Sequence, residues 1–158
     1  MKHSYFSRRL LSVFMALALG LSVLLAKDFV VVIDAGHGGH DPGSLGSKAK
    51  EKNINLGVAL KLGRLIENNM QGVKVVYTRK KDVYLTLQER ANIANKVQGD
   101  LFISIHTNSL DKKSPNRRKV AGASTWTLGL HRSKENLEVA KRENSVIYLE
   151  NDFSTRYE

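Results

Sequence analysis

Residues 29–33 form an unbroken apolar run of mostly β-branched side chains, and a glycine-rich segment, residues 35–46, follows almost at once. Such a run is typical of a strand that is covered on both faces, as in the sheets of α/β proteins. The glycines predict a loop, because glycine adopts backbone conformations that other residues resist. The sequence therefore predicts a buried strand ending in a loop, which is where α/β folds place their binding residues.

The next segments alternate between helical and extended patterns. Apolar residues recur at spacings of three and four over residues 53–69 and again over residues 87–97, which predicts two amphipathic helices. Residues 73–77 and 101–106 have the β-branched, apolar composition of strands. The order β, α, β, α, β predicts an α/β fold, with helices packed on an at least partly parallel sheet.

Two further elements are expected in the last third of the chain. Residues 123–127, around Trp126, have a strand-like composition. Ser133 is a suitable N-cap for a helix over residues 133–144, whose end carries the basic residues Lys141 and Arg142.

The first 26 residues have the pattern of a secretory signal peptide. Lys2, Arg8 and Arg9 precede an uncharged, mostly apolar run of 17 residues, and charge returns at Lys27. At about 1.5 Å per residue this run is slightly shorter than the hydrocarbon core of a bilayer, so cleavage is favoured and an uncleaved N-terminal anchor is the alternative. Residues 27–158 then form one exported domain, in the periplasm or cell envelope.

The composition limits the partners and the chemistry of this domain. The formal net charge is +10, which suits either a nucleic acid or the anionic cell envelope, and export favours the envelope, with no nucleic-acid partner. The chain has no cysteine, which excludes disulfides and a cysteine nucleophile. The glycine-rich loop matches neither a P-loop nor a dinucleotide fingerprint, so nucleotide binding is disfavoured.

Three residues are placed so that they can meet around a metal ion. His37 follows the first predicted strand, Glu51 precedes the first helix, and His106 ends the third predicted strand. Strand ends converge at one edge of a parallel sheet, so these side chains can lie close together. Two imidazoles and one carboxylate match a catalytic zinc site with a fourth position open, although other divalent metals accept the same ligands.

Other polar residues nearby are given different roles. Asp34 is expected at a buried strand end, and His40 and Asp41 have the composition of a turn. Arg79 and Arg90 are interpreted as structural or anion-facing and are given no part in the chemistry, because arginine stays protonated and cannot act as a base. A single histidine at a strand end is more often a hydrogen-bonded structural residue than a ligand, so the metal site depends on all three residues together.

Five blocks of the sequence also carry a family resemblance. They are residues 32–39 (VIDAGHGG), 51–56 (EKNINL), 76–79 (VYTR), 87–95 (LQERANIAN) and 101–109 (LFISIHTNS). In this order and spacing they resemble the zinc-dependent N-acetylmuramoyl-L-alanine amidases of the AmiC-like type, amidase type 3. The resemblance implies a mixed, largely parallel sheet flanked by helices on both faces.

The resemblance also implies a function. Zn²⁺ would be held by His37, Glu51 and His106, the substrate would be the amide between N-acetylmuramic acid and L-alanine of peptidoglycan, and a protein activator is a further expected partner. The family's general base is a glutamate close to the C-terminal end, and Glu150 and Glu158 are the late candidates, neither in the expected strand context.

The catalytic base is therefore not identified, and we expect it beyond Glu158. On this interpretation the catalytic domain, residues 27–158, is incomplete at its C-terminal end. Residues 133–151 would begin an inserted regulatory helix that can cover the zinc. The alternative function is a non-catalytic, zinc-containing peptidoglycan-binding or regulatory relative that lacks the general base.

Overall fold

The computed structural model describes residues 27–107, 109, 113, 115, 119–127 and 134–149, together with residues 12 and 15. The predicted signal peptide thus lies almost entirely outside the described residues, and it stays a prediction. Within the described part, no helix combines the length and the apolar character needed to cross a membrane. The elements follow the order β1 (Phe29–Ala35), α2 (Glu51–Asn69), β2 (Val73–Tyr77), α3 (Leu87–Lys96), β3 (Leu101–Ile105), α4 (Lys134–Glu143) and the 3-10 helix η1 (Ser145–Leu149).

The three described strands form a parallel sheet in the order β2-β1-β3. β1 is the central strand, and Val31 pairs with Val75 on one side and with Leu101 on the other. This central position explains the unbroken apolar run, because β1 is covered on both faces as well as paired along both edges. The predicted α/β class with parallel strands and flanking helices is confirmed.

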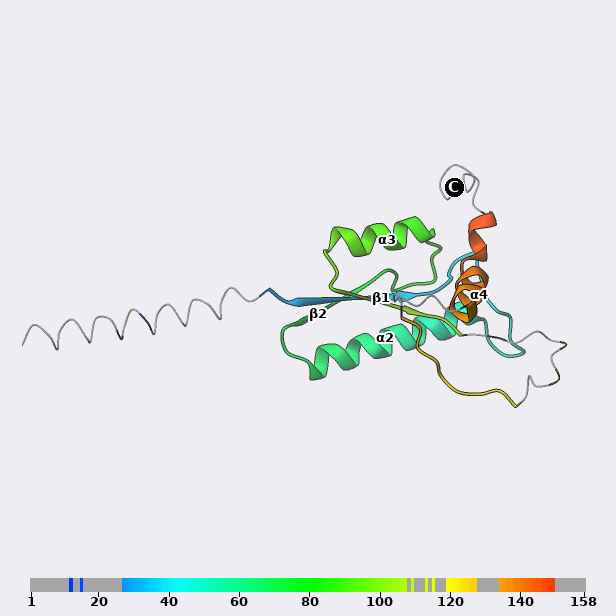
Figure 1. Ribbon diagram of the computed structural model, residues 1–158, viewed down its shortest axis with the longest axis horizontal. Helices are drawn as coiled ribbons and strands as arrows, with labels where there is room; N and C mark the ends of the chain where they lie inside the picture. Colours follow the sequence, from blue (N-terminus) through cyan, green and yellow to red (C-terminus); the bar gives the residue numbers. More distant parts are fainter. Residues whose placement is uncertain are drawn as a thin grey trace, which may run out of the picture.

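α2 and α3 lie on opposite faces of the sheet (Figure 1). Residues Val31, Ile33 and Ala35 of β1 are buried against Ala59 of α2, and this cluster is the apolar core of the described part of the chain. Alternate residues of a strand point to opposite faces, so Val32 and Asp34 point away from α2. The carboxyl end of β1, where the glycine-rich loop begins, therefore emerges between two helix layers.

The helix that carries Glu51 begins earlier than the apolar spacing predicted. α2 starts at Glu51, so this residue occupies the first helical turn, where a carboxylate is favoured by the helix dipole. α3 starts after Thr86, whose side chain accepts the backbone N–H of Glu89 at 3.1 Å while the Glu89 carboxylate accepts the Thr86 N–H at 2.7 Å. This capping box fixes the start of α3.

The last third of the chain agrees with one prediction and contradicts another. The helix predicted over residues 133–144 is present as α4, Lys134–Glu143. The strand predicted over residues 123–127 is wrong, since this segment has no regular structure and the side chain of Trp126 is 47% exposed. A strand-like composition is not sufficient here, because these residues pair with none of the three described strands.

Candidate metal centre

The three predicted ligands come together at the carboxyl edge of the sheet. His37 lies in the loop directly after β1, Glu51 is the first residue of α2, and His106 follows β3 directly. The rings of His37 and His106 meet edge to face, with their centroids 4.8 Å apart. The Glu51 carboxylate lies 3.4 Å from His37 Nε2 and 3.4 Å from His106 Nδ1.

Two glycines allow this close approach. A Cβ atom at Gly36 would collide with the ring of His106, and one at Gly43 would lie 2.6 Å from the ring of His37 and 2.9 Å from Cβ of Glu51. Gly43 also has a positive φ of 63°, which favours glycine. Two glycines of the predicted loop therefore leave the space that the predicted ligand side chains occupy.

The two imidazole nitrogens that face the centre are buried, and neither makes a hydrogen bond within the described structure. These atoms are His37 Nε2 and His106 Nδ1. Carboxylate oxygens of Glu51 and Glu143 lie 3.0 to 3.6 Å from these nitrogens without forming a hydrogen bond of good geometry. Buried polar atoms are nearly always satisfied, so imidazole nitrogens and carboxylate oxygens that converge in this way indicate a site for a cation. Together with Glu51 and Glu143, the two histidines form a group whose ligand atoms all lie within 4.8 Å of one another.

The Glu51 carboxylate is fixed by three hydrogen bonds. Its Oε1 atom accepts the backbone N–H of Thr107 at 2.7 Å and a side-chain N–H of Asn55 at 3.3 Å. Its Oε2 atom accepts the backbone N–H of Ser44 at 2.9 Å. Because Ser44 belongs to the loop after β1 and Thr107 follows His106, the carboxylate ties both histidine-bearing segments to α2.

Asp41 orients His37. Its Oδ2 atom lies 2.8 Å from His37 Nδ1, and its Oδ1 atom accepts the backbone N–H of Gly43 at 3.1 Å. A carboxylate at Nδ1 fixes the ring so that Nε2 faces the ion, as is usual for metal-binding histidines. Asp41 was predicted only to lie in a turn, so this orienting contact was not predicted. A carboxylate four residues from a candidate ligand is the signal that could have found it.

The electrostatics of the metal-free centre are those of paired opposite charges. Burial alone would lower the pKa of His37, but the carboxylates of Asp41, Glu143 and Glu51 outweigh it and raise the pKa to about 11. Burial would also lower the pKa of His106, but the carboxylates of Glu143 and Glu51 outweigh it and raise this pKa. The two histidines in turn lower the pKa of Glu51, and that of Glu143 to about 2, against the effect of burial. The carboxylates thus favour protonated rings at this site, and a bound metal ion would compete with those protons.

The fourth member of the cluster was not among the predicted site residues. Glu143 is the last residue of α4, and its Oε2 atom lies 3.0 Å from His106 Nδ1 and 3.6 Å from His37 Nε2. Figure 1 places α4 beside the carboxyl end of β1. A carboxylate at a helix C-terminus faces the negative end of the helix dipole, so its position there is a signal that it has a partner elsewhere.

Two cavities open on either side of Glu143. One, of about 640 Å³, extends from the centre along α3 and the open face of β3, and the other, of about 430 Å³, adjoins Gly43 and Ser44. Glu143 lines both cavities. The end of α4 therefore lines both of these cavities beside the centre.

The other candidates do not join the centre. His40 is exposed and packs against the ring of Tyr84, with centroids 4.0 Å apart. Asp34 is buried beneath the centre, as predicted for a strand end, and is 3% exposed. The late candidates Glu150 and Glu158 lie outside the described residues.

The fold and the cluster define a parallel α/β domain with two histidines and two glutamates that could hold a metal ion at the carboxyl edge of its sheet. A family model for N-acetylmuramoyl-L-alanine amidases, Amidase_3, matches residues 31–156, and the chain belongs to this family.

Individual relatives agree with this assignment. The chain is 38% identical over 100 residues to the N-acetylmuramoyl-L-alanine amidase AmiC of Escherichia coli, a match that covers 63% of this chain and 24% of that protein. Among solved structures, it is similar to the amidase AmiC2 of Nostoc punctiforme, with 40% identity, a TM-score of 0.50, and coverage of 54% of this chain and 47% of the other. It is also similar to an amidase of Clostridium difficile 630, with 36% identity, a TM-score of 0.52, and coverage of 56% of this chain and 47% of the other. The matches to the first curated relatives cover between 26% and 54% of those proteins.

Proposed function

We propose that this chain carries the metal centre of an exported amidase that hydrolyses the bond between N-acetylmuramic acid and L-alanine in peptidoglycan. His37, Glu51 and His106 would hold Zn²⁺. The observation that carries the proposal is the pair of buried imidazole nitrogens, without a well-formed hydrogen bond, that converge on the fixed carboxylate of Glu51 at 3.4 Å. Membership of the amidase family supports the reaction, and the donor set of two imidazoles and one carboxylate supports zinc.

The residues around the centre fit this chemistry. When bound, zinc supplies a Lewis acid that activates water and polarises a carbonyl group. Asp41 lies at Nδ1 of His37, so with a metal bound it would hold the proton at Nδ1 and leave Nε2 as the ligand atom. The hydrogen bonds to Glu51 favour its ionised carboxylate beside the two rings. These contacts pre-form three ligand positions before any ion enters, which limits the reorganisation that binding requires.

Glu143 supports a latent form of the enzyme. Its carboxylate lies where a water molecule or the substrate carbonyl would bind beside the three ligands. We propose that α4 covers the centre in this state and that hydrolysis requires the end of α4 to move away. A protein activator could supply that movement. The general base is not assigned.

An assay on purified peptidoglycan tests the reaction. The chain, and a version extended at its C-terminus, are incubated with purified sacculi, with and without a chelator and added Zn²⁺, and newly formed L-alanine N-termini are quantified. We expect chelator-sensitive release of stem peptides from the extended version at least. If stem peptides stay attached under every condition although the protein contains stoichiometric zinc, the proposed hydrolysis is wrong.

The same position of Glu143 favours one alternative. A centre whose fourth position is permanently filled by a carboxylate would give a non-catalytic, zinc-containing module that binds peptidoglycan. Sedimentation with sacculi distinguishes the two functions: wall binding by both versions, without release of peptides from either, supports the non-catalytic module.

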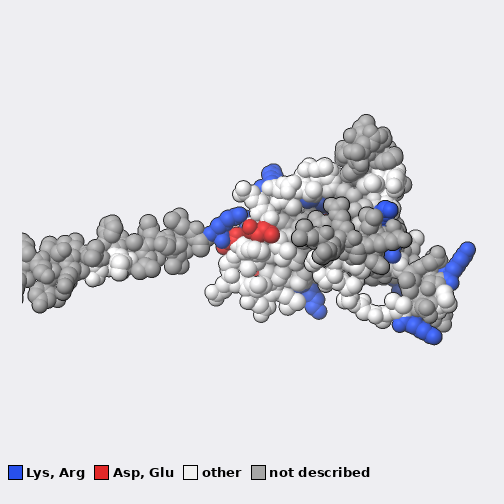
Figure 2. Space-filling model, viewed as in Figure 1, with Lys and Arg blue, Asp and Glu red and all other residues white. Residues whose placement is uncertain are grey.

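Export of the protein is part of the proposal. Residues 1–26 would be the signal peptide, or the N-terminal anchor, and the domain would act in the periplasm or cell envelope. On the face shown in Figure 2, the described Lys and Arg side chains are scattered and do not form one continuous stripe, which agrees better with a solvated surface than with a nucleic-acid groove.

A further inference from the structure

Two buried arginines bind three consecutive carbonyl groups that lead into the metal loop. Arg79 donates to the carbonyl of Ala35 at 2.8 Å and to that of Gly36 at 3.0 Å. Arg90 donates to the carbonyl of Ala35 at 2.9 Å and to that of His37 itself at 3.0 Å. The arginines are 3% and 6% exposed, so these bonds lie in the interior, where they are strong.

One of these arginines also reaches the segment that carries the second ligand. Arg79 Nη2 donates to the carbonyl of Lys52 at 2.9 Å, and Lys52 directly follows Glu51 in the first turn of α2. A single guanidinium group therefore joins the start of the metal loop to the start of the ligand-bearing helix. Its planar fork of donors makes this possible, whereas a lysine ammonium would bind fewer of these carbonyls at once.

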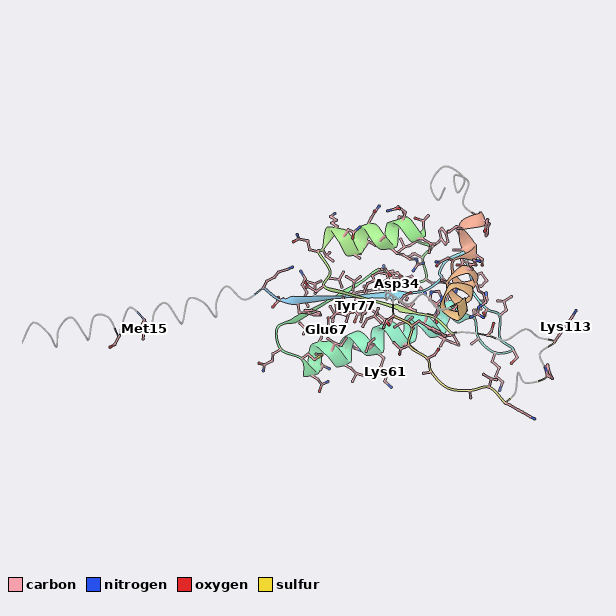
Figure 3. The ribbon with its side chains drawn as sticks, viewed as in Figure 1. Met15, Asp34, Lys61, Glu67, Tyr77 and Lys113 are labelled. Carbon is pink, nitrogen blue, oxygen red and sulfur yellow. The ribbon has the colours of Figure 1, made fainter. Side chains whose placement is uncertain are left out.

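Asp34 connects this arrangement to the third ligand. Its carboxylate accepts Arg90 Nη1 at 2.7 Å, Thr78 Oγ1 at 2.7 Å and Ser104 Oγ at 2.9 Å. Thr78 follows β2, and Ser104 lies on β3 two residues before His106. Asp34 lies at β1, between the α2 and α3 layers (Figure 3), so its carboxylate links all three strands directly beneath the centre.

The backbone held in this way has a strained conformation. His37 has a φ of 62°, in the left-handed region that residues other than glycine rarely adopt. Such a conformation persists only where the surroundings enforce it, and here the carbonyl of His37 is fixed by Arg90 while its ring is fixed by Asp41. The left-handed turn directs the ring towards Glu51 and His106.

We propose that Arg79, and Arg90 anchored by Asp34, are positioning residues for the metal centre: they hold the backbone around His37 and Glu51 so that the ligand atoms converge. This inference rests on the proposed metal site. Two guanidinium groups beside one buried carboxylate are a poor choice for simple core packing, because apolar residues fill such space at lower desolvation cost. Their donors end instead on the carbonyls of the ligand-bearing segments.

The test uses Co²⁺ in place of zinc, because its visible absorption reports ligand geometry and its binding is measured without an activity assay. Arg90→Lys keeps the positive charge beside Asp34 but loses the fork. We expect the variant to fold, to bind Co²⁺ about 10- to 100-fold more weakly and to have an altered absorption band. Losses of this size are typical when a group that holds a metal ligand in place is removed. Arg64→Lys, an exchange of an exposed arginine on α2, is the matched control.

A second control separates positioning from general stability. Val30 is buried near the opposite end of β1, so Val30→Ala should lower the melting temperature of the metal-free protein without changing the Co²⁺ band. If Arg90→Lys binds Co²⁺ like the wild type, or if Val30→Ala reproduces its spectral change, the inference is wrong. Ser104→Ala decides the question should Arg90→Lys fail to fold: loss of one hydrogen bond to Asp34 should weaken Co²⁺ binding about threefold. Unchanged binding in that variant would overturn the inference.

The wild-type protein distinguishes the two proposals. If it does not bind Co²⁺ or Zn²⁺ at all, the metal centre itself is wrong and the positioning role falls with it. If it binds the metal and the Arg90 and Ser104 variants bind equally well, only the positioning role is wrong.

Discussion

Two carboxylates face the same pair of histidines, and the protein holds them in different ways. Glu51 lies in the first turn of a long helix that packs on the sheet core, and its oxygens accept three hydrogen bonds from Ser44, Asn55 and Thr107. Glu143 lies at the end of a ten-residue helix, and the contacts described for its carboxylate are with the two histidines and with its neighbour Arg142.

In the proposed metal site, this difference would make Glu51 a fixed ligand and Glu143 a removable one. Displacing Glu51 breaks hydrogen bonds to three segments of the chain, whereas displacing Glu143 mainly exchanges its histidine contacts for water. The dipole of α4 also opposes a carboxylate at this end of the helix. A centre built in this way can bind its ion permanently while its fourth position opens and closes.

The largest effect is expected at the histidines. His37→Ala or His106→Ala should abolish stoichiometric zinc, because each removes one of the three fixed ligands. His40→Ala is the control, since His40 is exposed and packs on Tyr84, and it should keep its zinc. Metal analysis of the purified variants is the measurement. Unchanged zinc in both ligand variants would show that the centre is not where the geometry indicates.

The two carboxylates should respond differently to the same substitution. Glu51→Gln should weaken Zn²⁺ binding by about 100-fold or more, because a fixed charged ligand is lost. Glu143→Gln should change the affinity far less but should accelerate removal of the ion by a chelator, because the cover is loosened. Competition with a chromophoric chelator gives both quantities. Equal losses of affinity in the two variants would remove the distinction between fixed and removable ligands.

Asp41→Asn should have an intermediate effect on the fixed side of the centre. The asparagine keeps the size of the side chain but loses the charge that holds His37, so we expect about 10-fold weaker Zn²⁺ binding. Asp82→Asn is a suitable control, because Asp82 binds Gly39 and Lys52 but does not contact the ligands. Calorimetric titration measures the Zn²⁺ affinity of both variants. Wild-type affinity in Asp41→Asn would show that the ring of His37 is held by its backbone alone.

The smallest effect is a pH dependence of the metal-free state. Because the pKa of His37 is raised to about 11, the stabilisation from its ion pairs is complete below its unfolded pKa near 6.5 and is lost as the pH rises towards 11. The pKa of Glu143 is lowered to about 2, so the ion pairs of its carboxylate stabilise the metal-free fold fully above pH 4.5. This stabilisation is lost as the pH falls towards 2. Zn²⁺ binding at pH 7 should therefore release about one to two protons.

Calorimetry in buffers of different ionisation enthalpy measures this release. Glu143→Gln should reduce it, because the histidines lose one of the carboxylates that keep them protonated. An identical proton count in the wild type and in Glu143→Gln would mean that Glu143 does not interact with the histidines in solution.

The parts of this site that sequence analysis predicted are those fixed by local pattern. His37, Glu51 and His106 each lie at the boundary of an element whose type follows from its apolar spacing, and strand order then brings them to one edge. The resemblance implied a helix that can cover the zinc, but Glu143 was missed because the spacing within α4 does not show which of its side chains faces the centre.

The arginines were set aside for a related reason. A search for acids, bases and ligands overlooks side chains whose targets are backbone carbonyls, and those contacts arise only when the chain is folded. The strand predicted around Trp126 failed because a strand requires a neighbour, and composition does not supply one.

With the proposed metal bound, the pairing of β1 with β3 has a consequence for the stability of the domain. His37 and His106 leave adjacent strands at matching ends, so an ion bound between them bridges the strand pair and must be released before the pair separates. Free zinc at 100 times its dissociation constant would add about 2.7 kcal/mol to the free energy of unfolding. The supply of zinc outside the cell would then determine how long the domain survives there.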